Sequence, residues 1–334
     1  MMSRLNGFLR QAARIEITIA LALLAGGLAL AGSHFGWRVG AVMAAPAFGL
    51  FVNLCAALLT NRTLSARPAL FAFHVGLAVL ALSLAADALS SFSGHVEIVN
   101  GGDFDARRVV GEARPWHRSR LPEIRFRQKS FDISYAPGMK RRETASVIET
   151  RVDGEAREVV VGDDRPLVIS GYRLYTSFNK GFAPVVTFID AAGIAHTGAV
   201  HLPSYPLNED RQANAWRPPG ASAEIVVWLE LEKPVYDEDA SWRFAVPQTS
   251  SLVGIAGGER RRLSPGESAP LASGAVRYEG LSAWMGYTIT SNPYSSVAAA
   301  AALASVLALI WEIIGKLAAP FPARLRTDAE ARHA

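Results

Sequence analysis

Four long apolar stretches, three near the start of the chain and one near its end, flank a long polar region. They cover residues 15–33, 39–59, 68–92 and 294–319. A helix needs about 20 apolar residues to cross the hydrocarbon core of a bilayer, and each stretch is near that length. The pattern predicts a membrane protein with four transmembrane α-helices. The first three lie within residues 1–92, and Pro46 predicts a kink in the second.

The first stretch has an alternative interpretation as a cleaved secretory signal. Basic residues precede it, and Ala29 and Ala31 resemble the small residues of a cleavage site. Two further apolar stretches follow after short connections. We therefore favour an anchor that remains as the first membrane helix.

The flanking charges predict the orientation of the chain. The N-terminus, the 60–67 loop and the tail from Lys316 onward carry three, two and four Lys or Arg residues, whereas the 34–38 turn carries one. Cytoplasmic loops are the ones enriched in these residues. We expect both termini, including residues 320–334, on the cytoplasmic side of a bacterial inner membrane, with residues 93–293 forming a periplasmic domain.

The polar region between the third and fourth helices predicts an all-β domain. Alternating or β-rich runs recur between turn signals such as Pro137-Gly138 and Asp153-Gly154, and helical periodicity is absent. A sandwich or an open barrel is expected, with an irregular insertion around 202–223. The predicted strands cover 124–134, 146–152, 158–161, 167–178, 185–190, 224–231, 275–278 and 286–290.

Charge and cysteine content exclude some classes of function. Residues 93–292 hold 24 Lys or Arg and 25 Asp or Glu, so the domain lacks the basic surface of a nucleic-acid-binding protein. The single cysteine, Cys55, excludes an intrachain disulfide and a CxxC redox pair. Motifs of hydrolases, phosphate loops, zinc proteases and dinucleotide-binding folds are absent.

Other polar clusters of the domain favour surface roles. His196 and His201 are five residues apart, which places them on opposite faces of a strand and disfavours a shared metal. The basic runs 140–142 and 260–262 are interpreted as solvated faces.

His74 is the ionisable residue that most needs an explanation. It lies six residues into the third predicted helix, about 9 Å from its start. It could be a neutral packing residue that donates to a carbonyl of a neighbouring helix, or a ligand of haem iron. Asp87 is about 20 Å further along the helix, and no other histidine of the chain lies at this depth. A bis-histidine haem site would therefore need a ligand from a second protein.

Three segments resemble the ResB-like, or CcsB-type, family of cytochrome c biogenesis proteins of System II. They are LFAFHVGLAVLALSL in the third span, RPLVISGYRLYTSF at 165–178, and GYTITSNPYSSVAAAAALASVLALIWEIIGK at 286–316. The family has three membrane helices, a large extracytoplasmic β domain and a last helix. This layout is similar to the present one over nearly the whole chain.

The resemblance implies a subunit of a membrane haem delivery and cytochrome c synthase complex. Such a subunit works with a CcsA-type membrane protein that carries a tryptophan-rich haem-binding motif, and with apocytochrome c as the client. His74 would be an axial ligand to haem in transit, and the chain alone would not be an enzyme. The alternatives are a membrane-anchored scaffold that binds no cofactor, and a b-haem redox subunit, which the histidine count disfavours.

Overall fold

The computed structural model describes residues 2–35, 39–152, 155–206, 212–218, 224–256, 259–271 and 273–318. They form two compact units. The helical unit comprises Met1–Ser91, Ala113–Arg118 and Asn292–Ala334, and the β unit comprises Phe92–Glu112 and Ser119–Ser291. The expected tail at 320–334, the turn residues 36–38 and 153–154, and parts of the 202–223 insertion lie outside the described residues.

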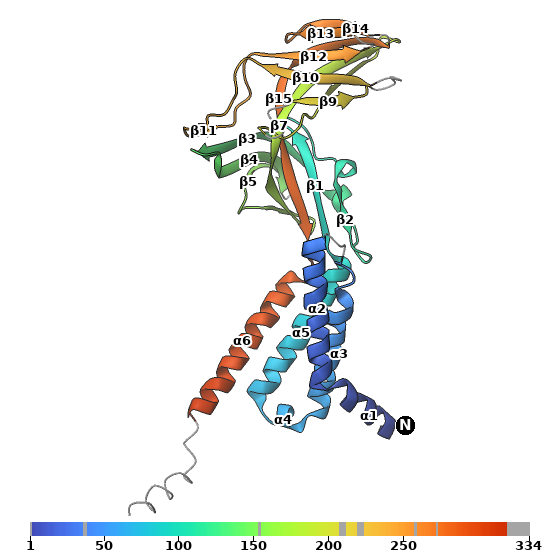
Figure 1. The fold of residues 1–334 in the computed structure, drawn as a ribbon, viewed down its shortest axis with the longest axis vertical. Helices are drawn as coiled ribbons and strands as arrows, with labels where there is room; N and C mark the ends of the chain where they lie inside the picture. Colours follow the sequence, from blue (N-terminus) through green and yellow to red (C-terminus); the bar gives the residue numbers. More distant parts are fainter. Residues whose placement is uncertain are drawn as a thin grey trace, which may run out of the picture. The chain divides into compact units, whose positions relative to one another are not determined.

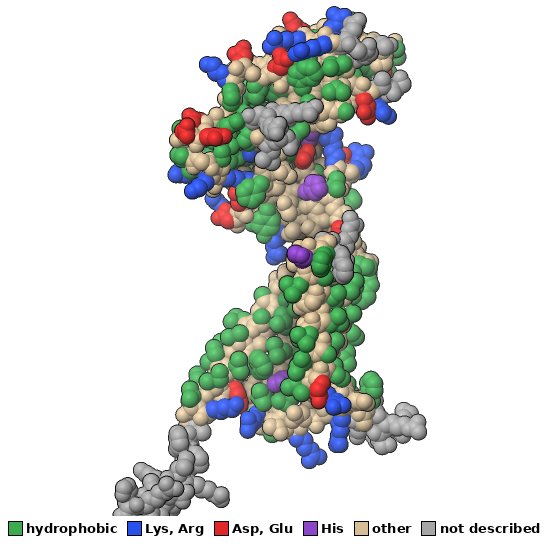
Figure 2. Space-filling view, viewed as in Figure 1, with side chains coloured by type: hydrophobic (Ala, Val, Ile, Leu, Met, Phe, Trp, Pro, Cys, Tyr) green, Lys and Arg blue, Asp and Glu red, His purple; other side chains and the backbone are tan. Residues whose placement is uncertain are grey.

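The helical unit contains three helices that are long and apolar enough to cross a membrane, namely α2, α5 and α6. A shorter apolar helix, α3, packs between α2 and α5, and α5 packs against α6. Figure 2 shows hydrophobic side chains covering these helices, with charged side chains gathered at the end where α4 lies. The bounds are α1 Met2–Ala12, α2 Ile15–Phe35, α3 Ala44–Thr60, α4 Arg62–Ser65, α5 Pro68–Ser90 and α6 Ser295–Ala318.

The second helix differs from its prediction. It begins at Ala44 rather than residue 39, after a turn, and has 17 residues. Pro46 therefore lies in the first helical turn. There its missing N–H has no intrahelical acceptor to lose, so no kink is required. Pro68 behaves as expected, because it occupies the start of α5.

A buried asparagine fixes the junction between α1 and α2. Asn53 of α3 is 3% exposed, accepts a hydrogen bond from Thr18 and donates to the carbonyls of Ala12 and Arg14. The Ala12 carbonyl ends α1 and has no partner within that helix, whereas the Arg14 carbonyl also accepts from the backbone N–H of Ile17 in α2. The side chain thereby orients α1 against the span that follows it.

The β unit consists of antiparallel strands in three sheets (Figure 1). The large sheet has the order β2-β1-β15-β7-β6, with β14 beside β15 and β8 beside β7; the other two are β13-β12-β10-β9 and β11-β3-β4-β5. The strands are β1 Phe92–Val99, β2 Val110–Ala113, β3 Phe126–Ala136, β4 Lys140–Val152, β5 Glu155–Val161, β6 Leu167–Ile169, β7 Tyr172–Asp190, β8 Ala195–Ala199, β9 Ala213–Trp216, β10 Ile225–Leu231, β11 Trp242–Arg243, β12 Ser250–Ala256, β13 Glu259–Leu263, β14 Ser268–Leu271 and β15 Gly274–Ser291.

Two strands are longer than the sequence pattern predicts. The predicted run 167–178 contains a hairpin, because Ser170 and Gly171 both adopt positive φ in a two-residue turn between β6 and β7. Strand β7 then continues to Asp190, and β15 joins the two runs predicted at 275–278 and 286–290. Two register shifts in the β7–β15 ladder break the strict alternation of side chains that the prediction relied on.

The two smaller sheets pack on different parts of the large sheet. One core joins β1, β7 and β15 to β3 and β4, and the other joins the far parts of β7 and β15 to β10 and β12. Inside the first core, Gln128, Ser146 and Tyr287 share hydrogen bonds and are almost fully buried. Burial raises the pKa of Tyr287, so its hydroxyl stays protonated.

Candidate functional site

His74 lies in the second turn of α5 with one ring nitrogen already bonded. Its Nδ1 is 2.8 Å from the carbonyl oxygen of Leu70, one turn earlier in the same helix. A carbonyl only accepts, so Nδ1 carries the proton and Nε2 keeps its lone pair in the neutral ring. The ring is partly exposed and meets Phe73 edge-on at 5.2 Å. This arrangement leaves Nε2 as a nitrogen suited to a metal ion.

The packing of α5 shows which side of the helix His74 occupies. Buried positions follow two faces, one with Ala69, Gly76 and Ser83 and the other with Ala78 and Ala85. A Cβ placed on Gly76 would meet Ser305 and Ala301, so the first face contacts α6. His74 precedes Ala78 by four residues and therefore shares the other face, the one away from α6.

A charge cluster joins α5 and α6 at the end of the bundle nearest His74. Glu312 of α6 is 3.6 Å from Arg67, which precedes α5, and 3.3 Å from Lys316 one turn along its own helix. The Glu312 side chain is only 12% exposed. Because burying an ionised carboxylate is costly unless it is paired, these two cations stabilise it. The Glu312–Lys316 pair spans one turn of α6, whereas Arg67 links α6 to the start of α5, a segment distant in sequence.

No second histidine accompanies His74 among the described residues of the helical unit. His34 lies in the last turn of α2, and His117 donates from Nδ1 to the carbonyl of Ser90, the last residue of α5. Both therefore lie near the C-terminal ends of α2 and α5, whereas His74 lies near the start of α5. Haem fits the nitrogen that His74 offers, because metal-binding histidines commonly donate their other N–H to a backbone carbonyl.

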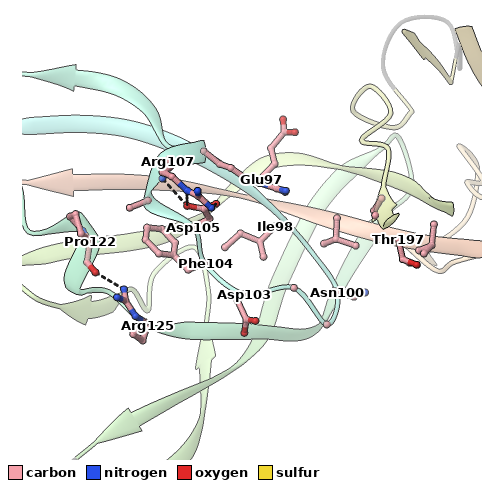
Figure 3. A pocket seen from close by; sticks show the side chains of 18 residues that line it. Glu97, Ile98, Asn100, Asp103, Phe104, Asp105, Arg107, Pro122, Arg125 and Thr197 are labelled. Atoms are coloured by element: carbon pink, nitrogen blue, oxygen red, sulfur yellow. Dashed lines mark hydrogen bonds and ion pairs between the residues drawn. The ribbon is translucent and has the colours of Figure 1, made fainter. Parts of the chain in front are cut away.

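The β unit has a large open pocket of about 850 Å³. It lies between the end of β1, the loop that follows it, and β8; Figure 3 shows Phe104 and the Asp105–Arg107 pair on one side and Thr197 on the other. The Arg107 hydrogen bonds lower the pKa of Asp105 to about 2. Asp103 is held in the same way by Arg127, which lowers its pKa. Carboxylates bound by arginine are poor proton acceptors at neutral pH, so the pocket is better suited to binding than to acid–base catalysis.

His196 in β8 and His201 just after it do not share a ligand. His196 faces Asp190 at 3.5 Å, and His201 donates to Glu97 at 3.0 Å while its ring stacks on Trp284. Among the described residues, no three His, Cys, Asp or Glu side chains are grouped as metal ligands. His201 is not the solvated residue that the sequence suggested, because its side chain is 22% exposed and closes over Trp284.

Two buried cations of the β unit were missed by the sequence analysis. Arg141, expected on a solvated face, has a side chain only 7% exposed, because it bonds to Asp163 and to the Ser177 carbonyl. Lys180 is 6% exposed, and its ammonium lies over the Tyr135 ring at 5.1 Å. Burial, with the nearby charge of Arg141, lowers the pKa of Lys180 to about 8. Both are charged residues in polar-looking stretches, and nothing in the local pattern marks them as buried.

No curated protein matches the chain. The sequence model of the ResB-like family matches residues 53–314, which include His74, all the strands of the β unit and most of α6. This match covers most of the chain. The chain therefore belongs to the ResB-like family.

Proposed function

We propose that this chain is the haem-handling subunit of a membrane complex that delivers haem and attaches it to apocytochrome c. Membership of the ResB-like family supports a role in cytochrome c biogenesis. The long apolar helices support its residence in a membrane. In the proposal, α2, α3, α5 and α6 all cross the inner membrane, the termini are cytoplasmic, and the β unit is periplasmic.

The observation that carries the haem assignment is the hydrogen bond between His74 Nδ1 and the Leu70 carbonyl. It holds the imidazole in the tautomer whose Nε2 can bind iron, and it fixes the plane of the ring. The site is about 9 Å from the start of α5, which the proposed orientation puts in the cytoplasmic half of the membrane. Haem is the cargo of this site, and its iron takes a single ligand from this chain.

The remaining functions are divided between this chain and its partners. A CcsA-type membrane protein with a tryptophan-rich motif supplies the second axial ligand. The β unit, with its mixed-charge pocket beside β8, is the part that receives apocytochrome c. The chain has an accessory role in this scheme, and the thioether bonds are made by the complex.

The test compares haem content in purified complexes. The chain is purified with its membrane partner, either as wild type or as His74→Ala, and the haem absorbance is measured per mole of chain. We expect His74→Ala to lose most of the bound haem or its six-coordinate spectrum. Added imidazole should restore the spectrum, because it can occupy the position left by the side chain.

A matched control is His34→Ala, which removes a histidine at the other end of the helical unit. It should retain wild-type haem content. Unchanged haem in His74→Ala would refute the ligand assignment. Absence of haem from every complex, including the wild type, would favour the alternative of a scaffold that binds partners without a cofactor.

A further inference from the structure

A short segment between two parts of the β unit belongs to the helical unit. The loop Ala113–Arg118, called here the 113–118 loop, groups with the helices. Its backbone N–H groups at Arg114 and Trp116 donate to the carbonyls of Ser91 and Leu89 at 3.1 and 2.8 Å. His117 donates to the carbonyl between them, that of Ser90, at 3.0 Å. Three successive carbonyls at the end of α5 are thus capped by one loop.

A second contact fixes the loop against a neighbouring span. The Arg114 guanidinium lies over Gly40, where an added Cβ would fall 2.0 Å from its central carbon. Gly40 lies in the turn that leads into α3, so the loop touches the beginning of one apolar helix and the end of another. At the same level, Asp87 of α5 accepts from the backbone N–H of Tyr294, which precedes α6. The 113–118 loop therefore sits at the plane where the apolar helices end.

The chemistry of the loop matches that plane. Trp116 is 67% exposed, although an indole ring is costly to leave in water. Arginines lie two residues to either side of it, and the loop contains no acidic residue. Trp and Tyr are enriched at membrane–water interfaces, where the ring enters the acyl boundary while its N–H stays hydrated. Guanidinium groups bind lipid phosphates. Phe35 and Tyr294, also exposed, end α2 and precede α6.

We propose that the 113–118 loop is a membrane-surface anchor that returns the chain to the lipid after β2. Trp116 enters the headgroup region of the bilayer, and Arg118 contacts lipid phosphates. The occupant of this surface is lipid, because the loop is continuous with the ends of helices that are themselves apolar over their exposed faces. The proposal depends on the membrane crossing of these helices and is independent of haem binding.

The test uses site-directed spin labels in the full chain. Cys55, the single cysteine, is replaced by serine, and Trp116→Cys is labelled after reconstitution into nanodiscs of phosphatidylcholine and phosphatidylglycerol. Collisions with oxygen, which partitions into lipid, are compared with collisions with a water-soluble nickel chelate. Val168→Cys is the matched control, because Val168 is 66% exposed on β6 of the β unit. Leu24→Cys, on the exposed face of α2, is the standard for deep lipid exposure.

We expect the oxygen-to-nickel ratio at position 116 to lie between those of positions 24 and 168. A ratio equal to that at Val168→Cys would overturn the proposal. So would shielding from both reagents, which indicates a protein contact instead of lipid. Trp116→Phe, which retains an aromatic ring, provides a second measurement. Brominated lipids should quench more of the wild-type fluorescence than of the variant, and equal quenching would also contradict the anchor.

Discussion

At the scale of single residues, Lys180 shows how a polar side chain becomes buried on this fold. It lies in β7 beside Ser204, whose hydroxyl donates to the Lys180 carbonyl. Among the described residues, no carboxylate lies within ion-pair distance of its ammonium, which lies over the Tyr135 ring. The lowered pKa follows from this loss of solvation, because a buried ammonium without an anion is less stable than in water.

Lys180→Met is expected to stabilise the protein at pH 7. Between pH 8 and its ordinary pKa of 10.5, the unfolded state binds more protons at Lys180 than the folded state does, so wild-type stability rises with pH in that window. The free energy of unfolding of the variant should exceed that of the wild type by at most roughly 3 kcal/mol at neutral pH. This difference should shrink above pH 8. Thermal unfolding of the full chain in detergent across pH 7–10 measures this.

The exposed Lys140→Met is the matched control for that series. The difference in stability between Lys140→Met and wild type should not shrink above pH 8 as that of Lys180→Met does. A constant difference between Lys180→Met and wild type from pH 7 to 10 would contradict the buried-ammonium account.

At the scale of elements, close packing between α5 and α6 depends on small residues. A Cβ on Gly76 would lie 2.2 Å from the Ser305 hydroxyl and 3.1 Å from the Ala301 carbonyl oxygen. Helices in membranes associate through such close backbone approach, because lipid and side chains are similarly apolar. The contact lies two residues beyond His74, on the face of α5 that meets α6.

Gly76→Ala is therefore expected to destabilise the helical unit by about 1–3 kcal/mol, the usual cost of overpacking a tight contact. Gly315→Ala is the matched control, since no atom lies within 4 Å of the Cβ it would add to α6. That control should be neutral or slightly stabilising, as alanine favours helix over glycine. Thermal unfolding in detergent compares the two. A Gly76→Ala protein as stable as wild type would show that α5 and α6 can separate without loss.

At the scale of the whole molecule, the distribution of charge predicts sidedness. In a chain lacking Cys55, Val168→Cys should react with a membrane-impermeant maleimide in cells whose outer membrane has been permeabilised. Ser65→Cys, exposed at the end of α4, should react only after lysis, because the positive-inside bias places this segment in the cytoplasm. The opposite labelling pattern would reverse the proposed topology. Equal labelling of both sites in unlysed cells would contradict the membrane crossing of α5.

The apolar stretches, the β character of the middle region and the place of His74 near the start of an apolar helix could all be read from the sequence. Hydropathy and two-residue alternation are local signals, and they depend little on which elements become neighbours. The same holds for Pro68 at the start of α5, because proline imposes its preference on its own turn. The family resemblance, carried by the third span and the last strand and helix, is confirmed by the family match.

Other features depended on contacts between residues far apart in the chain. Whether β7 runs on from Lys180 to Pro184 is set by the β15 partner that pairs with it, and burial of Lys180 and Arg141 is set by the sheets that cover them. The sequence of the 113–118 loop does not indicate where the loop lies, because its position depends on hydrogen bonds to the carbonyls at the end of α5. Both the local sequence and the folded structure contribute to what is known of His74. Its depth follows from its position in an apolar stretch, while its free Nε2 follows from a hydrogen bond that the folded helix provides.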